Sequence, residues 1–324
     1  MDILFLILGL ALILAGANML TDGASAIAKR RGIPDIVIGL TVVAFGTSAP
    51  EFVISLLSAI EGSTELAIGN AVGSNIFNVL AIIGITALVR PVSIERGILT
   101  SDIPLVIVSA LALLAMGSGQ WLGDTAGARV LGRSDGIVLL LFFAIFMRYT
   151  FAQASAPAAQ ADEAAAASAA MRPMSAWKSA LWVVLGLAGL IGGGSLFVDG
   201  ASGIASALGV SEAVIGLTIV AAGTSLPELA TSVVSALKGK PGIAVGNVIG
   251  SNIFNIFFVL GSAATVRPLS FGSIGEPDLL VLVGACCLFW LFGWFFKARI
   301  ITRLEGAVLA ACYVAYTAWL VASA

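Results

Sequence analysis

The sequence predicts an all-α integral membrane protein with ten transmembrane helices in two inverted five-helix repeats, whose core helices are broken. Three observations predict this. Of the 324 residues, 59% are hydrophobic and only 10% are charged, whereas an average soluble domain has about 25% charged residues. Apolar stretches of membrane-spanning length recur along the chain, and its second half repeats its first. So few charged residues exclude an ordinary water-soluble domain.

Ten apolar stretches separated by polar or Gly- and Pro-rich breaks are long enough to cross a membrane, which takes about 20 residues. The first begins Met-Asp without a basic leader and has a counterpart later in the chain, so we expect it to be a helix and not a cleaved signal. The predicted crossings are 3–21, 37–60, 66–89, 100–118, 135–153, 178–197, 212–237, 243–264, 278–297 and 304–322.

The distribution of basic residues predicts the orientation, because cytoplasmic loops collect Lys and Arg. With the N-terminus outside, thirteen of the 16 basic residues fall on the cytoplasmic side, and only Arg129, Arg133 and Arg267 lie outside. The chain is therefore predicted to be integral to the cell (inner) membrane with both termini outside. The Ala-rich stretch 154–176 is predicted to be a cytoplasmic linker between the repeats 1–153 and 177–324.

An internal duplication relates the two halves. Residues 39–91 align without a gap to residues 216–268, and 28 of these 53 positions are identical. Each half has five predicted crossings, and an odd number makes the second half enter the membrane from the opposite side. Inverted repeats of this kind are typical of secondary transporters.

The composition excludes several other functions. The net charge of −2 gives no reason to expect a nucleic-acid partner. Histidine is absent, which excludes imidazole metal sites and Ser-His catalytic triads. The three cysteines lie in apolar runs and are read as small buried hydrophobes. We expect no enzymatic activity and no cofactor; the expected partners are membrane lipid and transported ions, and the expected state is a monomer.

Two acidic residues lie in the middle of predicted crossings. Glu51 ends the sequence Gly-Thr-Ser-Ala-Pro-Glu, and Glu228 ends its copy, Gly-Thr-Ser-Leu-Pro-Glu. An ionised side chain at this depth costs at least about 3 kcal/mol, and no Lys or Arg is predicted at comparable depth. Two acids without a basic partner must share a proton or a cation, and inverted symmetry would bring them together.

A proline precedes each of these acids and predicts a broken helix. Pro50 and Pro227 cannot donate backbone hydrogen bonds, so we expect free carbonyls at 44–47 and 221–224. Carbonyls, hydroxyls, amides and carboxylates are oxygen ligands, which suit hard cations, with Ca²⁺ favoured over Mg²⁺ and Na⁺ also possible.

Polar side chains recur at helical spacing around these acids. Thr47, Glu51, Ser55 and Ser58 are predicted to share one helix face, and Asn70, Ser74 and Asn78 another. The serines of the first face could instead bond to their own helix, and the nearby glycines are better explained as close-packing positions. The second repeat carries the same polar side chains at Thr224, Glu228, Ser232, Ser235, Asn247, Ser251 and Asn255.

Four charged residues near the ends of predicted crossings have other expected roles. Asp22 and Asp199 suit capping or interfacial roles, and Arg90 and Arg267 suit interfacial anchoring.

These motifs resemble the cation/Ca²⁺ exchanger superfamily, specifically its prokaryotic sodium/calcium exchanger branch. Both halves carry a G-T-S-x-P-E element followed by G-N-x-x-G-S-N-I-F-N. The resemblance implies a core of helices 2, 3, 7 and 8, along which helices 1 and 6 slide. It implies a calcium site at Glu51 and Glu228 with the carbonyls of Thr47 and Thr224. The sodium sites that it implies add Ala44, Ala221, Ser48, Ser225, Ser74, Ser251 and the central pair Asn78 and Asn255.

The predicted function is therefore a secondary antiporter that exchanges several Na⁺ for one Ca²⁺ by alternating access and extrudes Ca²⁺. A Ca²⁺/H⁺ antiporter and a K⁺-dependent Na⁺/Ca²⁺ exchanger are alternatives. Asparagine at both central positions disfavours a dependence on K⁺. Proton-coupled relatives have glutamate where this chain has Gly73 and Gly250, which disfavours coupling to H⁺. An intramembrane aspartyl protease and a passive channel stay open as other classes.

Overall fold

The computed structural model describes residues 1–118, 129–154, 174–208, 221–296 and 299–323. Eight of the described helices are long and apolar enough to cross a membrane, and a ninth span is formed if the bent pair Asp35–Thr47 and Ala49–Glu61 counts as one. The predicted crossing 212–237 is described only from residue 221, where it contains the short apolar helix Leu226–Leu237. An integral membrane protein is thus confirmed, and the count of ten stays a prediction.

The elements follow the predicted order, with α for α-helices and η for π-helical segments. In the first half they are α1 (Asp2–Arg31), α2 (Asp35–Ile38), η1 (Gly39–Val43), α3 (Ala44–Thr47), α4 (Ala49–Glu61), α5 (Thr64–Ile76), η2 (Phe77–Ile82), α6 (Ile83–Val89), β1 (Val92–Ser93), η3 (Ile98–Asp102), α7 (Ile103–Gly117), β2 (Val130–Leu131) and α8 (Arg133–Ala154). In the second they are α10 (Ala176–Ala207), α12 (Ala221–Gly223), α13 (Leu226–Leu237), α14 (Pro241–Ile253), η6 (Phe254–Leu260), α15 (Gly261–Val266), β3 (Leu269–Ser270), α16 (Glu276–Phe295), β4 (Ile300–Ile301) and α17 (Arg303–Ser323).

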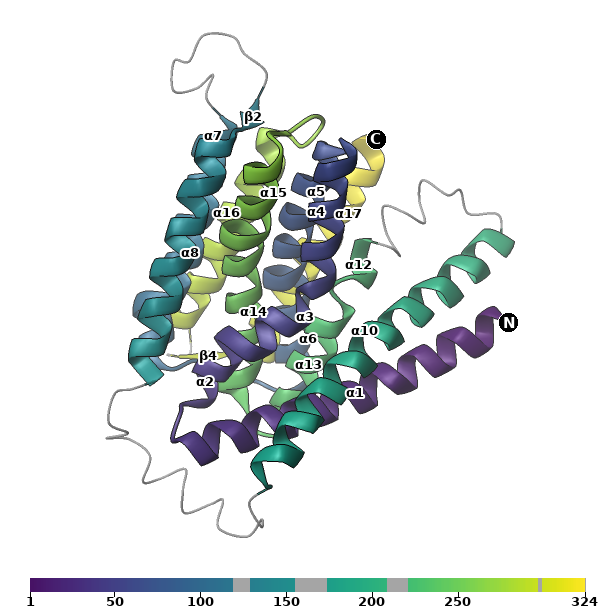
Figure 1. Cartoon of the computed structure of the whole chain (residues 1–324), viewed down its shortest axis with the longest axis vertical. Helices are drawn as coiled ribbons and strands as arrows, with labels where there is room; N and C mark the ends of the chain where they lie inside the picture. The colour runs from purple at the N-terminus through teal and green to yellow at the C-terminus, as the bar shows by residue number, and fades with distance from the viewer. Residues whose placement is uncertain (119–128, 155–173, 209–220, 297–298, 324) are drawn as a thin grey trace.

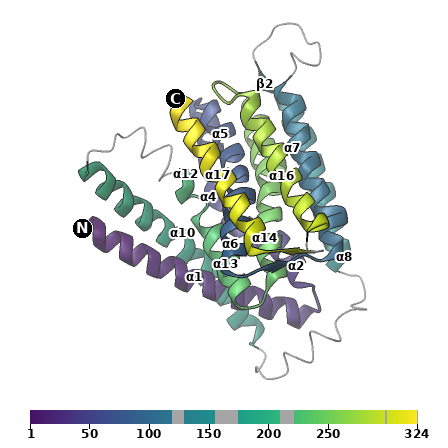
Figure 2. The same ribbon diagram turned by 180° about the vertical axis from the view of Figure 1, so that it is seen from behind.

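Helices α1 and α10 lie side by side and run obliquely to the remaining bundle (Figures 1 and 2). The sequence placed their ends at residues 21 and 197, which is wrong, because they continue to Arg31 and Ala207. Hydropathy falls at Asp22, but the following Ala-rich segment still favours a helix, and α1 stops only at Gly32 with φ 65°. With 30 and 32 residues, each helix is about 45 Å long at 1.5 Å per residue. Both exceed the roughly 30 Å hydrocarbon layer, which a tilt accommodates.

Glycines let the backbones of α1 and α10 touch. A β-carbon built on Gly16 would lie 2.7 Å from the carbonyl oxygen of Gly186, and one built on Gly186 would lie 2.6 Å from the amide nitrogen of Leu20. Gly9 and Gly193 face each other in the same way. Small residues that allow such approach are typical of helix pairs in membranes.

Two short antiparallel sheets tie the two halves of the sequence together. Strand β1 pairs with β4, with Val92 opposite Ile301, and β2 pairs with β3, with Val130 opposite Ser270. Strands β2 and β4 lie at opposite ends of the bundle (Figure 1). Each end of the bundle therefore has a two-stranded sheet made of one strand from each half.

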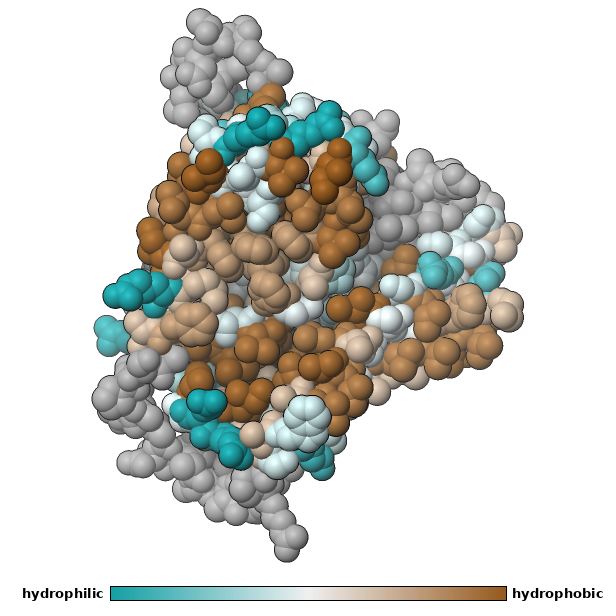
Figure 3. Space-filling view, in the orientation of Figure 1, coloured by the Kyte–Doolittle hydropathy of each residue, from teal (hydrophilic) through white to brown (hydrophobic). Residues whose placement is uncertain are grey.

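Two spans form the centre of the protein. The most apolar windows of Thr64–Val89 and Pro241–Val266 are 78% and 94% buried, against 44% or less in the other long spans. The outer helices expose apolar side chains such as Leu141 and Ile145. Figure 3 shows hydrophobic side chains over the middle of the bundle, with hydrophilic ones toward its ends. This surface suits a lipid environment.

Candidate ion-binding site

Both helices that carry the acidic motifs are interrupted one residue before the Ala-Pro or Leu-Pro pair. Helix α3 ends at Thr47, α4 begins at Ala49, and the two axes differ by 48°. Ser48, with φ −84° and ψ 11°, is the junction. Pro50 then lies in the first turn of α4, where no helical hydrogen bond is lost. Ser225 occupies the equivalent junction before α13.

The break places Glu51 and Glu228 in the first turns of α4 and α13. A helix N-terminus carries a partial positive charge, which stabilises a carboxylate. Both side chains are only 1% exposed. Thr47 lies before the bend and Glu51 after it, and Thr47 is also fully buried.

Each glutamate is hydrogen-bonded by the junction serine of the other half. Ser48 Oγ donates to Glu228 Oε1 at 2.7 Å, and Ser225 Oγ donates to Glu51 Oε1 at 3.1 Å. The same serines lie 2.8 Å from Ser251 Oγ and 3.2 Å from Ser74 Oγ, respectively. The structure thus brings six predicted site residues, three from each half, into one buried cluster.

Four of the buried oxygens that have no hydrogen-bond partner among the described residues belong to predicted site residues. They are Glu51 Oε2, Glu228 Oε2, Asn78 Oδ1 and Asn255 Oδ1. Buried acceptors are normally satisfied, so unsatisfied ones need an explanation such as an ion. All four atoms are acceptors, which a cation can satisfy.

No basic side chain neutralises the two glutamates within the described part of the chain. The two salt bridges found there join Lys238 to Asp22 and Lys240 to Asp35. Nor do three or more acidic or cysteine side chains gather into a metal-binding group among these residues. A cation at this place would therefore be held by two carboxylates and by neutral oxygens.

Two asparagines support the backbone at the glutamates. Asn70 Nδ2 donates to the carbonyl of Glu51 at 3.2 Å and to Ser55 Oγ at 2.9 Å. Asn247 Nδ2 makes the equivalent bonds to Glu228 and Ser232 at 3.2 and 3.1 Å. Ser55 and Ser232 in turn donate to carbonyls of the neighbouring helices at Ala67 and Ala244. The alternative interpretation, that Ser55 and Ser232 bond to carbonyls of their own helices, is therefore wrong.

The prediction of free carbonyls at the break is wrong for Ala44. Its carbonyl oxygen accepts the Ser48 amide at 3.0 Å and Thr47 Oγ1 at 3.4 Å. In the second half, Ala221 begins α12, and Thr224 is half-buried in the turn before Ser225. Residues 212–220, which include the first part of the repeated motif, lie outside the described residues.

Asn78 and Asn255 lie in the π-helical segments η2 and η6, directly after the phenylalanines with which these segments begin. π-Helical turns are rare and often mark functional positions. Sequence spacing did not reveal them, because it assumed a regular α-helix through Asn70, Ser74 and Asn78.

Arg90, Arg267 and Asp22, which the sequence also singled out, contact residues at the ends of other helices. Arg90 Nη1 donates to the carbonyl of Leu237, and Arg267 Nη1 donates to that of Ile60, at 2.7 and 3.3 Å. These carbonyls belong to the last turns of α13 and α4, where positive charge is favourable. Asp22 Oδ1 pairs with Nζ of Lys238, the residue that follows α13, at 2.6 Å.

Comparisons with known proteins agree with this geometry. The sequence profile of the family described as sodium/calcium exchanger protein matches residues 1–152 and 178–322. The chain is 38% identical over 315 residues to a putative antiporter, CaxA, of Alkalimonas amylolytica, covering 97% of this chain and 96% of that protein. It is 32% identical over 355 residues to the sodium/calcium exchanger MaX1 of Methanosarcina acetivorans, covering 97% of each.

A solved structure has the same fold. It is the sodium-calcium exchanger NCX_Mj soaked with 10 mM Na⁺ and 10 mM Sr²⁺, with a TM-score of 0.82, 32% identity, and coverage of 98% of this chain and 97% of that one. The profile match spans most of the sequence, and the fold agrees over nearly its whole length. The chain therefore belongs to the sodium/calcium exchanger family.

Proposed function

We propose that this protein exchanges several Na⁺ for one Ca²⁺ by alternating access and extrudes Ca²⁺ from the cell. The observation that carries the proposal is the buried pair Glu51 and Glu228, which lacks a basic partner in the described residues. Each of these glutamates accepts a hydrogen bond from a serine of the other half. The exchanger names of MaX1 and NCX_Mj support the same ions.

Competition for the two carboxylates would couple the ions. One Ca²⁺ would neutralise both Glu51 and Glu228, and several Na⁺ would share these carboxylates and recruit neutral oxygens. Calcium suits this arrangement because it accepts numerous, flexible oxygen ligands. The neutral oxygens that we assign to the sodium sites come from Ala221, Thr47, Thr224, Ser48, Ser225, Ser74, Ser251, Asn78 and Asn255.

Charge neutralisation would also control the conformational change. Two bare carboxylates facing apolar helices would carry a large desolvation cost. We therefore infer that α1 and α10 slide past the core only when ions occupy it. An empty site would block the movement, so Ca²⁺ could cross the membrane only in exchange for Na⁺. A passive channel would need no such counter-ion.

We further propose ten transmembrane helices in two inverted repeats, 1–153 and 177–324, joined by the linker 154–176. Equivalent contacts 177 residues apart support this: the bonds from Arg90 to Leu237 and from Arg267 to Ile60 exchange the two halves. The asparagine bonds to the two glutamate carbonyls are equivalent as well, but each of them lies within one half. Both termini would lie outside a cell (inner) membrane.

Ion flux into liposomes tests the proposal and its alternatives. We expect an outward-directed Na⁺ gradient at fixed pH, without K⁺, to drive accumulation of radioactive Ca²⁺ by the purified protein. The reason is that the site offers Na⁺ the same oxygens as Ca²⁺. Accumulation driven by a pH gradient alone would show Ca²⁺/H⁺ exchange, and a strict need for K⁺ would show the K⁺-dependent type.

Alanine at Ser48 or Ser225 is expected to raise the Na⁺ concentration needed for half-maximal exchange by about tenfold or more. Each substitution removes a hydrogen bond to a charged group, which is worth about 1.5–3 kcal/mol. The Na⁺ dependence of Ca²⁺ uptake measures the effect. Ser109→Ala is the matched control, because Ser109 is also fully buried but bonds to Val106 of its own helix. Equal effects of all three variants would refute a specific role for the junction serines.

A further inference from the structure

Two asparagines next to the cluster are equivalent in the duplication but are bonded differently. Asn75 and Asn252 follow Ser74 and Ser251 directly and are 0% and 1% exposed. Asn75 reaches the other half: its Nδ2 donates to the carbonyl of Asn252, and its Oδ1 accepts from Asn255 Nδ2, both at 3.1 Å. Both ends of the Asn75 amide are thus used.

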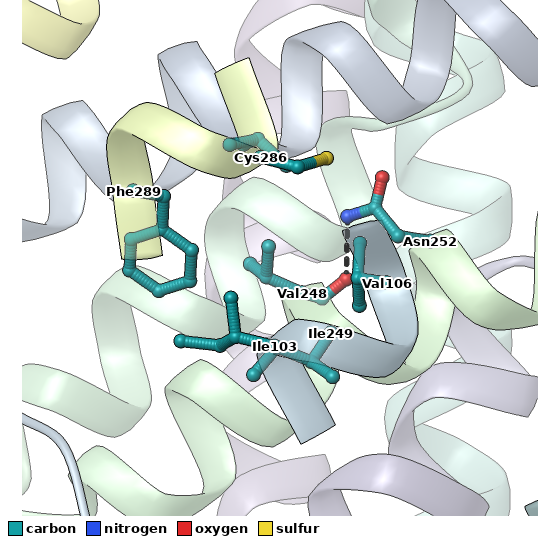
Figure 4. A pocket seen from close by; sticks show the side chains of 8 residues that line it. Ile103, Val106, Val248, Ile249, Asn252, Cys286 and Phe289 are labelled. Carbon is teal, nitrogen blue, oxygen red and sulfur yellow. Dashed lines mark hydrogen bonds between the residues drawn. The ribbon is translucent and has the colours of Figure 1, made fainter. Parts of the chain in front are cut away.

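Asn252 does not make the matching contacts. Its Nδ2 donates to the carbonyl of Val248 in its own helix at 2.8 Å, and its Oδ1 has no partner among the described residues. The side chain lines a small apolar pocket with Cys286 and Phe289 of α16 (Figure 4). The two-fold relationship between the halves is therefore broken at this position.

The bond from Asn255 to Asn75 fixes which end of the Asn255 amide is available. An amide carries two donor hydrogens on nitrogen and an acceptor oxygen. The nitrogen of Asn255 is directed to Asn75, and its Oδ1 is the buried atom left without a partner. A cation binds the oxygen and not the nitrogen of an amide. Asn75 thus holds Asn255 in the orientation that a cation requires.

We propose that Asn75 is a positioning residue that makes Asn255 a fixed oxygen ligand, whereas its counterpart Asn78 lacks equivalent support from Asn252. The central ion position is consequently asymmetric although the sequence around it is duplicated. This inference rests on the proposed function, since it specifies how one residue of the proposed sodium site is oriented. It also commits the acceptor atom of Asn75 toward position 255, which favours an amide there over an ionised carboxylate.

The Na⁺ dependence of Ca²⁺ uptake in liposomes tests this inference with Asn75→Ala and the matched control Asn252→Ala. We expect Asn75→Ala to raise the half-saturating Na⁺ concentration about tenfold, because a freed amide can turn its nitrogen toward the ion. Asn252→Ala should change it less than about twofold. The KM for Ca²⁺, which we assign to the two glutamates, should change far less than the Na⁺ value in both variants. Equal shifts for the two variants would overturn the inference.

A double substitution separates positioning from a general structural role. If Asn75 acts through Asn255, then Asn75→Ala combined with Asn255→Ala should be no worse than Asn255→Ala alone, since coupled residues are not additive. Additive losses would refute the inference. Asn75→Leu keeps the branched shape and the number of side-chain heavy atoms, and it gives the same test if the alanine variant does not fold. Absence of Na⁺-driven uptake by the unmodified protein would instead refute the proposed function.

Discussion

Substitution of Glu51 or Glu228 by glutamine is expected to reduce Na⁺-driven Ca²⁺ uptake by about a hundredfold or more. Glutamine preserves the size and one acceptor oxygen, so the serine of the other half can still bond to it. It removes one of the two carboxylates that would pair with Ca²⁺, and the loss of one partner from a buried ion pair costs about 3–5 kcal/mol. The initial rate of uptake into liposomes, at equal protein incorporation, measures the loss.

Glu61→Gln is the matched control for this experiment. Glu61 ends the same helix, α4, but is exposed, so the same chemical change should leave the uptake rate within about twofold. The pair assignment is contradicted if Glu51→Gln retains more than half of the uptake of the unmodified protein. Glu51→Gln and Glu228→Gln should also be similarly severe, because one Ca²⁺ is proposed to bind both carboxylates.

Gly16→Leu is the second substitution for which we expect a large effect, with more than a tenfold loss of uptake and a lower melting temperature. The new β-carbon would lie 2.7 Å from both Gly186 O and Leu190 N. These are backbone atoms, which cannot turn aside as a side chain can, and overpacking usually costs about 1–3 kcal/mol. The backbones of α1 and α10 would have to separate. Thermal unfolding in detergent and liposome uptake measure the two effects.

Gly192→Leu provides the comparison, because a β-carbon at Gly192 of α10 would meet open space. Leucine there should leave both the melting temperature and the uptake close to those of the unmodified protein. A Gly16→Leu variant that behaved like Gly192→Leu would show that the close approach of α1 and α10 is not needed for stability or transport.

The sequence predicted the pairing of Glu51 with Glu228 because the argument needed no coordinates. A duplicated acid at membrane depth, without a base at that depth, has few physical alternatives. The interruption of the helices was predictable as well, since a proline in the interior of a helix removes a hydrogen bond and is tolerated only in the first turn. The structure confirms that both acids are buried and that the helix carrying Glu51 bends beside Pro50.

Other features depend on packing that no spacing rule contains. Ser48 and Ser225 were carried over from the family resemblance. That each of them bonds to the glutamate of the other half becomes visible only when α4 and α13 are placed together. The π-helical segments at Asn78 and Asn255 shift the register that an α-helical spacing assumes. The excess length of α1 was missed because hydropathy marks the membrane boundary, whereas the helix continues into the polar segment up to Gly32.

The most direct test of the central claim is equilibrium binding of Ca²⁺ to the purified protein in detergent. It isolates the two carboxylates from the conformational cycle. We expect one Ca²⁺ per chain, displaced by Na⁺, and no such binding when Glu51→Gln and Glu228→Gln are combined. Unchanged Ca²⁺ binding by that double variant would contradict the claim that this buried pair of acids holds the transported ion.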